Sequence, residues 1–320
     1  MSNERQRLRA AIEHWVAFWD RREPPDALAS TRILVGTVVS ADLLIAAATR
    51  AMPALWSPPP LGMASGLASN PLPPVARWLG ATPETATLLW SVSVVSALLF
   101  LFGAFHRYNS WVLAFALAEL ARMQPDGDGF DRLMRIAVPI LALSQAGARW
   151  SFDAWLLRKR GKAPPETVPA WPRYLLLLQL AWMYFSAAHL RDGPAWWPWG
   201  GFAAIAQVLA DPHFARFPIG SFTPVYPLTQ VATVTTMLFE GSAPLVLFVP
   251  AWYEHETAPR WAQMLRNIRW GWLPTGVMLH LGIMVTLKIG AFPLGMLALY
   301  PALLHPDDLR KVRGFFRRPR

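Results

Sequence analysis

Eight ionisable residues lie within or beside apolar stretches of this chain, where a charge is costly. They are Asp42, Glu119, Asp131, Arg135, His189, Arg191, Glu240 and His280. In a membrane setting such residues mark either a functional site or a polar cluster that holds helices together. His280 and His189 are suited to proton transfer near neutral pH, and together with Asp131 they are the candidate catalytic residues.

The stretch from residue 179 to 200 concentrates these features. An apolar run over residues 174–185 leads to an ionisable cluster and then to an aromatic one. The clusters are His189, Arg191 and Asp192, followed by Trp196, Trp197, Pro198 and Trp199. This order is typical of a helix that ends at a membrane interface, where a guanidinium can hold an anionic or polar head group.

Each of these residues also has a structural explanation. Asp131 and Arg135 are four residues apart, the spacing of an ion pair within one helix. Glu240 precedes Pro244, so its carboxylate could accept bonds from backbone N–H groups that the proline frees. His189 and His280 could each be hydrogen-bonded inside a bundle.

Several other chemistries lack a signal in the sequence. The seven histidines are scattered without metal-ligand spacing on a predicted helix, so we predict no metal site. The chain has no cysteine, which excludes disulfides and thiolate chemistry. A Gly-rich phosphate loop and a Gly-x-Ser-x-Gly nucleophile elbow are also absent from the sequence.

The elements that must position these residues belong to a membrane protein. The chain has 320 residues, is 54% hydrophobic and contains 17 Trp and 30 Pro, with a mean hydropathy of +0.27. The net charge is +10, but the basic residues lie between apolar blocks. That distribution fits anionic lipid and topology control, and it argues against nucleic-acid binding.

We predict an all-α integral membrane protein, a single bundle of about eight transmembrane or re-entrant helices. The expected segments are 33–49, 86–105, 111–123, 133–148, 174–190, 225–249, 270–287 and 291–304. Several are shorter than the ~20 residues that span a bilayer comfortably, so we expect some of them to be re-entrant, entering the membrane without crossing it.

Basic residues predict the orientation. Lys and Arg collect in the N-terminal tail, in the connections after the fourth and sixth segments, and in the C-terminal tail. All four lie on one side if eight segments cross, which gives an inner-membrane protein with both termini cytoplasmic and Arg191 on the outer side. Residues 1–29 form a cytoplasmic segment whose amphipathic helix lies in the inner leaflet, 30–304 the transmembrane domain, and 305–320 a basic tail.

The order of local patterns resembles the HTTM domain, the membrane domain shared by vitamin K-dependent gamma-carboxylases and many short bacterial proteins. Four patterns carry the resemblance. They are Asp131 with a helix ending at Trp150-Ser151-Phe152-Asp153; Gln179-x-x-x-x-Tyr184-Phe185 leading to His189-Leu190-Arg191 and Trp196; Phe239-Glu240-Gly241-Ser242-Ala243-Pro244; and His280-Leu281-Gly282 with Gly290-Ala291-Phe292. Together they span residues 32–304.

This sequence departs from the carboxylases in two ways that argue against their reaction while leaving the resemblance in fold. The resemblance implies a basic Lys at position 191, but Arg191 stays protonated and cannot act as a base. The chain also ends 16 residues after its last apolar segment, so we expect no large extracytoplasmic domain. We therefore do not expect gamma-glutamyl carboxylase activity, and whether the protein is an enzyme stays open.

Three functions remain. The first is binding of a lipid-like or quinone-like amphiphile in an outward-facing pocket between the fourth to seventh segments, with a quinone-like molecule as the conceivable cofactor. The ligand-binding candidates are Arg191, Tyr184, Gln179, Glu240 and Trp196. The second is a non-catalytic accessory or immunity-type component with a structural polar cluster, whose protein partner is unknown. The third is a carboxylase-like enzyme of altered chemistry; a small transporter is less supported because no inverted repeat is found.

Overall fold

The computed structural model describes residues 2–51, 74–80, 82–123, 129–253, 258–305 and 308. The predicted basic tail 305–320 lies outside these residues, apart from His305 and Asp308. The described chain is all-α with one short pair of strands, as predicted. It forms two compact units, residues 1–173 with 298–320 and residues 174–297.

Of the helices in the described ranges, three stretches are long and apolar enough to cross a bilayer: Asp26–Ala48, Pro83–Phe102 and Thr223–Trp252. They coincide with the predicted first, second and sixth segments. The count of about eight segments stays a prediction.

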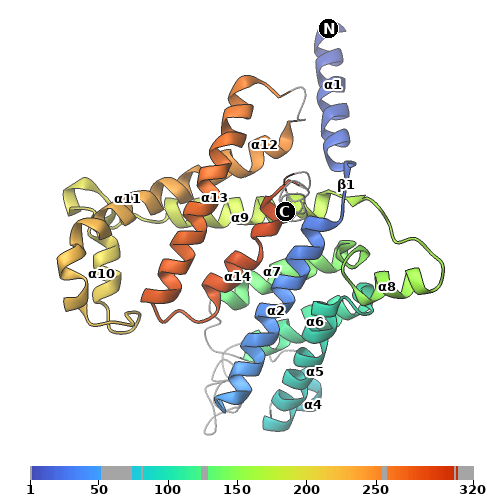
Figure 1. Ribbon diagram of the computed structural model, residues 1–320, viewed down its shortest axis with the longest axis horizontal. Coiled ribbons are helices and arrows are strands. Elements are labelled where there is room, and N and C mark those ends of the chain that lie inside the picture. Colours follow the sequence, from blue (N-terminus) through green and yellow to red (C-terminus); the bar gives the residue numbers. More distant parts are fainter. Residues whose placement is uncertain are drawn as a thin grey trace, which may run out of the picture. The chain divides into compact units, whose positions relative to one another are not determined.

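The first unit contains most of the chain's N-terminal half. Its elements are α1 (Ser2–Trp19), β1 (Arg22–Glu23), α2 (Asp26–Ala48), α4 (Pro74–Leu79), α5 (Pro83–Phe102), α6 (His106–Met123), α7 (Gly129–Leu143), η2 (Ala146–Ala148), α8 (Phe152–Lys159), β2 (Val168–Pro169) and α15 (Tyr300–Leu303). Figure 1 shows α2 among these helices; α2 contacts α5 and α7, and α6 contacts both α5 and α7.

The core of this unit lies along one face of α2. Val35, Val39 and Leu43 are buried and recur at helical spacing. A Cβ added at Gly36 would lie 2.7 Å from the Cα of Leu101, so the absence of a side chain allows α2 and α5 to pack closely.

The first family pattern has a structural explanation in this unit. Ser151 accepts the N–H of Ala154 at 2.9 Å and caps the start of α8. The Asp153 carboxylate accepts the N–H groups of Phe105 and His106 at 2.9 and 2.8 Å and so caps α6. Two residues of the Trp-Ser-x-Asp sequence therefore cap the first turns of two helices, α8 and α6, and link them.

A buried clasp holds the start of α9 (Trp171–His189). The antiparallel strands β1 and β2 place Glu23 opposite Val168. Both carboxylate oxygens of Glu23 accept the Nε–H of Arg173, at 2.8 and 2.9 Å, and Arg173 also donates to the Ala302 carbonyl at 3.3 Å. Burial raises the pKa of Glu23, and the charge of Arg173 opposes that shift.

The second unit is formed by the rest of α9 and the helices that follow it. They are η3 (Pro194–Trp196), η4 (Pro198–Gly200), α10 (Ala204–Ala210), η5 (Ile219–Ser221), η6 (Thr223–Val225), α11 (Tyr226–Ala243), the π-helical turn η7 (Pro244–Phe248), α12 (Val249–Trp252), α13 (Arg260–Thr286) and α14 (Phe292–Ala298). In this unit α11 contacts α10 and α13.

Two boundaries differ from the sequence expectation. The predicted sixth segment ended at Val249, whereas the helical stretch continues from Pro244 through a π-helical turn into α12, which ends at Trp252. The predicted seventh segment began at Trp270, whereas α13 begins at Arg260 and includes Arg266 and Arg269. The basic residues were assigned to a loop because charge lowers hydropathy, but Arg is a good helix former.

Candidate functional site

A cavity of about 620 Å³ lies within the second unit, among α9, α10, α11 and α13. Five of the predicted ligand-binding and catalytic side chains gather at it, Trp196 and four others. The others are Tyr184, Arg191, Glu240 and His280. The rest of the wall is predominantly aliphatic side chains and threonines of α10, α11 and α13. A polar end on an apolar chamber is the usual composition of a small-molecule site.

Arg191 and Glu240 form an ion pair at the cavity. Arg191 Nη2 donates to Glu240 Oε1 at 2.7 Å. The Nη1–Oε2 distance is 2.5 Å, a charge contact without the alignment of a hydrogen bond. The guanidinium carbon also lies 4.0 Å from the centre of the Trp196 ring, a cation–π geometry. Glu240 and Trp196 therefore already engage the guanidinium.

Tyr184 and His280 form the second polar pair. The Tyr184 hydroxyl and His280 Nε2 are 2.7 Å apart, and both side chains are buried. Either group can supply the proton, depending on the imidazole tautomer. The pair can thus offer a donor or an acceptor to a polar ligand without carrying a net charge.

Aromatic rings hold Tyr184 in place. Phe239 and Trp272 stack with ring centres 4.0 Å apart, and Tyr184 meets both edge-on at 5.0 and 5.6 Å. Trp272 Nε1 donates to the Phe239 carbonyl at 3.0 Å. This packing fixes the tyrosine ring and so the direction of its hydroxyl.

Other predicted residues are placed elsewhere. Gln179 and His189 are on α9 but do not line the cavity, and His189 stacks on Phe185 with ring centres 5.9 Å apart. Asp131 is on α7 of the first unit and is not a lining residue either. Glu119 is buried and accepts the first free N–H of α4 at 2.9 Å, which supports its structural reading.

Sequence reasoning missed most of the wall. Thr229 and Thr236 of the wall were not singled out, and Trp272, which packs on Tyr184 without lining the cavity, was counted only as part of an apolar segment. These threonines are seven residues apart on α11, so they share a face, and each hydroxyl donates to a carbonyl of the preceding turn. Polar residues at helical spacing inside an apolar helix are the signal that could have revealed this face.

No group of three or more His, Asp or Glu residues that could hold a metal ion occurs in the described parts of the chain. The site's polar groups are instead arranged as two self-paired dyads. Such an arrangement can bind a neutral polar group, and it can transfer a proton at Tyr184 and His280.

Comparison with known proteins gives one match. The family model of the HTTM domain matches residues 21–307. Comparison with curated proteins and with solved structures gave no match. The match covers both units and all four of the patterns that carry the resemblance.

Proposed function

The chain belongs to the HTTM-domain family, and on that basis we propose that it is a multi-pass membrane protein that binds a lipid-like or quinone-like amphiphile. The cavity of the second unit is the proposed binding site. Tyr184, Arg191, Trp196 and Glu240 are its proposed ligand-binding residues, and His280 is the residue proposed for any proton transfer.

The observation that carries the proposal is the division of the cavity into a polar end and an apolar chamber. Part of the apolar rim is exposed: Leu228 on α11 is 65% exposed and Met278 on α13 is 68% exposed. Because α11 belongs to a stretch long enough to cross a bilayer, this rim would face lipid. A ligand can then enter from the membrane with its tail along the rim.

The charges favour a neutral head group. Arg191 is neutralised by Glu240, so an added carboxylate or phosphate would have to displace that carboxylate or lie beside it. A quinone oxygen or an alcohol needs only a donor or an acceptor, and Tyr184 and His280 supply one. We therefore propose a neutral head group in preference to an anionic one.

We also propose the membrane arrangement that the basic residues predict. In it about eight segments cross or enter the inner membrane, and both termini are cytoplasmic. The connection that carries Arg191 and Trp196 then lies on the outer side, and the polar end of the cavity is near that surface.

The test is ligand-dependent thermal stabilisation of the purified protein in detergent. The probes are an alkylated benzoquinone, dodecanol and dodecanoate. A ligand at 100 times its Kd stabilises the folded state by about 2.7 kcal/mol. We expect stabilisation by the two neutral probes and much less by dodecanoate.

A matched pair of variants assigns the effect to the cavity. Tyr184→Phe removes only the hydroxyl and should weaken binding about 3- to 10-fold, the usual effect of losing a neutral hydrogen bond. Tyr226→Phe is the control, because Tyr226 lies on α11 outside the cavity. Equal stabilisation of Tyr184→Phe and wild type would contradict the proposed site.

The second candidate is the accessory or immunity-type component. The closed Arg191–Glu240 ion pair favours it, because a structural cluster needs no ligand. This reading predicts that none of the probes stabilises the protein and that Tyr184→Phe lowers the melting temperature without ligand. Ligand-dependent stabilisation that Tyr184→Phe diminishes would exclude it.

A further inference from the structure

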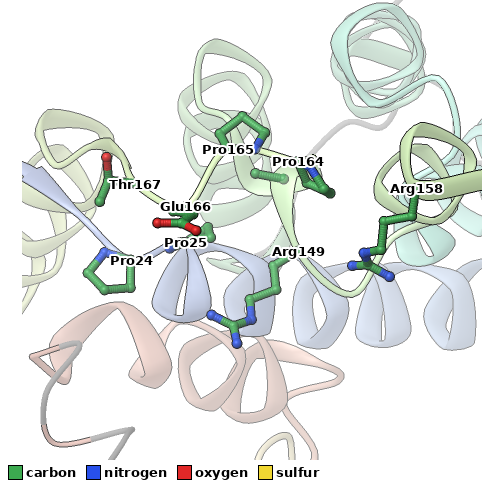
Figure 2. Close-up of a pocket in the computed structure, with 9 residues that line it drawn as sticks. Pro24, Pro25, Arg149, Arg158, Pro164, Pro165, Glu166 and Thr167 are labelled. Carbon is green, nitrogen blue, oxygen red and sulfur yellow. The ribbon is translucent and has the colours of Figure 1, made fainter. Parts of the chain in front are cut away.

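A second cavity, of about 550 Å³, lies within the first unit and shares no lining residue with the cavity described above. Four prolines form much of its wall: Pro24, Pro25, Pro164 and Pro165. Figure 2 shows them on two chain segments, the connection between β1 and α2 and the loop after α8. Because proline fixes φ, these walls lose little entropy when a ligand binds.

Two arginines supply the positive side of this cavity. Arg149 follows η2, and its Nη1 donates to Asp26 Oδ2 at 2.7 Å. Asp26 is buried, so this bond fixes the arginine stem, while the planar guanidinium has further N–H groups to offer. Arg158 reaches the cavity from α8 and is exposed. Arg158 can supply a guanidinium fork to a phosphate, and Arg149, already paired with Asp26, can add an N–H group.

The same cavity carries a carboxylate. Glu166 lines it and is exposed, in the loop that Figure 2 shows between the prolines and Thr167. Arg22 holds this loop: its Nη2 donates to the Thr167 carbonyl at 2.9 Å and its Nε to the Thr167 hydroxyl at 3.3 Å. A ligand with only negative charge would be repelled by the Glu166 carboxylate. A ligand that also carries a positive group could place that group against the carboxylate.

The neighbouring helix has the composition of a membrane-interface element. On α8, Phe152 and Trp155 are exposed, and Lys159 lies 5.2 Å from the Trp155 ring centre. Aromatic rings with adjacent basic residues are enriched at the level of lipid head groups. Arg158 of this helix lines the cavity, so the helix lies next to it.

We propose that this cavity binds a phosphoethanolamine group, with the phosphate on Arg149 and Arg158 and the primary ammonium on Glu166. The group is the head of phosphatidylethanolamine, and it also occurs free in water. A phosphatidylglycerol head has no cation for Glu166. A phosphatidylcholine head has one that cannot donate an N–H bond. The proposal is independent of the ligand in the second unit.

The test is lipid retention by the purified full-length chain, measured by native mass spectrometry. The protein is incubated in detergent with equal amounts of phosphatidylethanolamine, phosphatidylglycerol and phosphatidylcholine. We expect phosphatidylethanolamine to be retained preferentially. Glu166→Gln should lower that preference about tenfold, because a charge-assisted hydrogen bond is lost. Arg158→Gln should weaken retention of both phosphatidylethanolamine and phosphatidylglycerol.

Lys162→Gln is the matched control, since Lys162 is exposed in the same loop and does not line the cavity. Retention of the three lipids in equal amounts, or equal losses in Arg158→Gln and Lys162→Gln, would overturn the proposal. Free phosphoethanolamine is added as a competitor. If it displaces the lipid at equal concentration, the same recognition is supported with the soluble compound as its source. If it does not, the lipid is the ligand.

Discussion

At the scale of single residues, the side chain of Arg32 shows how the first unit uses a buried charge. It is fully buried and donates to four backbone carbonyls. The distances are 3.2 Å to Ala146, 2.8 Å to Phe100, 2.5 Å to Leu101 and 2.7 Å to Trp150. These carbonyls end α5 and flank η2, so one guanidinium joins three segments.

Replacing Arg32 by Met should therefore destabilise the folded protein. Arg32→Met keeps the apolar stem but leaves four carbonyl oxygens without their charged donor, and we expect a loss of about 3 kcal/mol or more in the free energy of unfolding. Denaturant unfolding of the protein in detergent measures it. Arg160→Met, at an exposed position, should change stability by less than about 0.5 kcal/mol. Equal stabilities of the two variants would refute this role of Arg32.

The sequence singles out ionisable residues but not their partners. Arg191, Glu240 and His280 were identified because charges inside apolar segments are rare. Their pairing depends on tertiary packing: Arg191 meets Glu240 across 49 positions of the chain, and Tyr184 meets His280 across 96. Arg32 escaped notice because it stands beside the start of an apolar run, where it reads as a flanking charge.

At the scale of elements, the junction between α5 and α6 is a tightly packed turn of the first unit. Gly103 ends α5 with φ of +62°, and its carbonyl accepts the N–H of Asp153 at 3.2 Å. A Cβ at Gly103 would lie 2.5 Å from Ser151 Cβ and 2.7 Å from Arg32 Nη1. The turn therefore needs glycine for its backbone angle and for space.

Gly161 provides a matched comparison for this junction. Its φ is +71°, but an added Cβ would meet nothing within 4 Å. Gly161→Ala should cost about 1 kcal/mol, the price of a left-handed alanine alone. Gly103→Ala should cost at least about 2 kcal/mol more, because overpacking adds to that strain. Unfolding midpoints of the two variants in detergent test the difference, and similar midpoints would contradict it.

Periodic apolar patterns predict that a helix exists better than they predict the residues at which it begins and ends. A helix was expected over residues 4–20 and is observed as α1, whereas its position in the inner leaflet stays a prediction. The end of α7 was expected at Ala148 but is at Leu143. A hydropathy pattern does not separate a helix from the apolar turn that follows it, because both are buried.

At the scale of the whole molecule, the open question is which helices cross the membrane. Only α2, α5 and the stretch from residue 223 to 252 meet the length and hydropathy of a span among the described residues. The other expected crossings do not meet both criteria in the described residues: the fifth and seventh contain His189 and His280, and the eighth, residues 291–304, is uncharged but short. The crossings beyond these three stretches stay a prediction.

The crossing by α9 can be tested directly, because the natural chain has no cysteine and any introduced thiol is unique. His213→Cys lies in the expected outer connection, where the native side chain is 89% exposed, and Lys162→Cys lies in the expected cytoplasmic loop. A membrane-impermeant maleimide should label the first variant in intact cells and the second only after the membrane is opened. Labelling of both variants in intact cells, or of neither, would place the two positions on one side. The α9 segment would then not cross, and the outward-facing position of Arg191 would have to be abandoned.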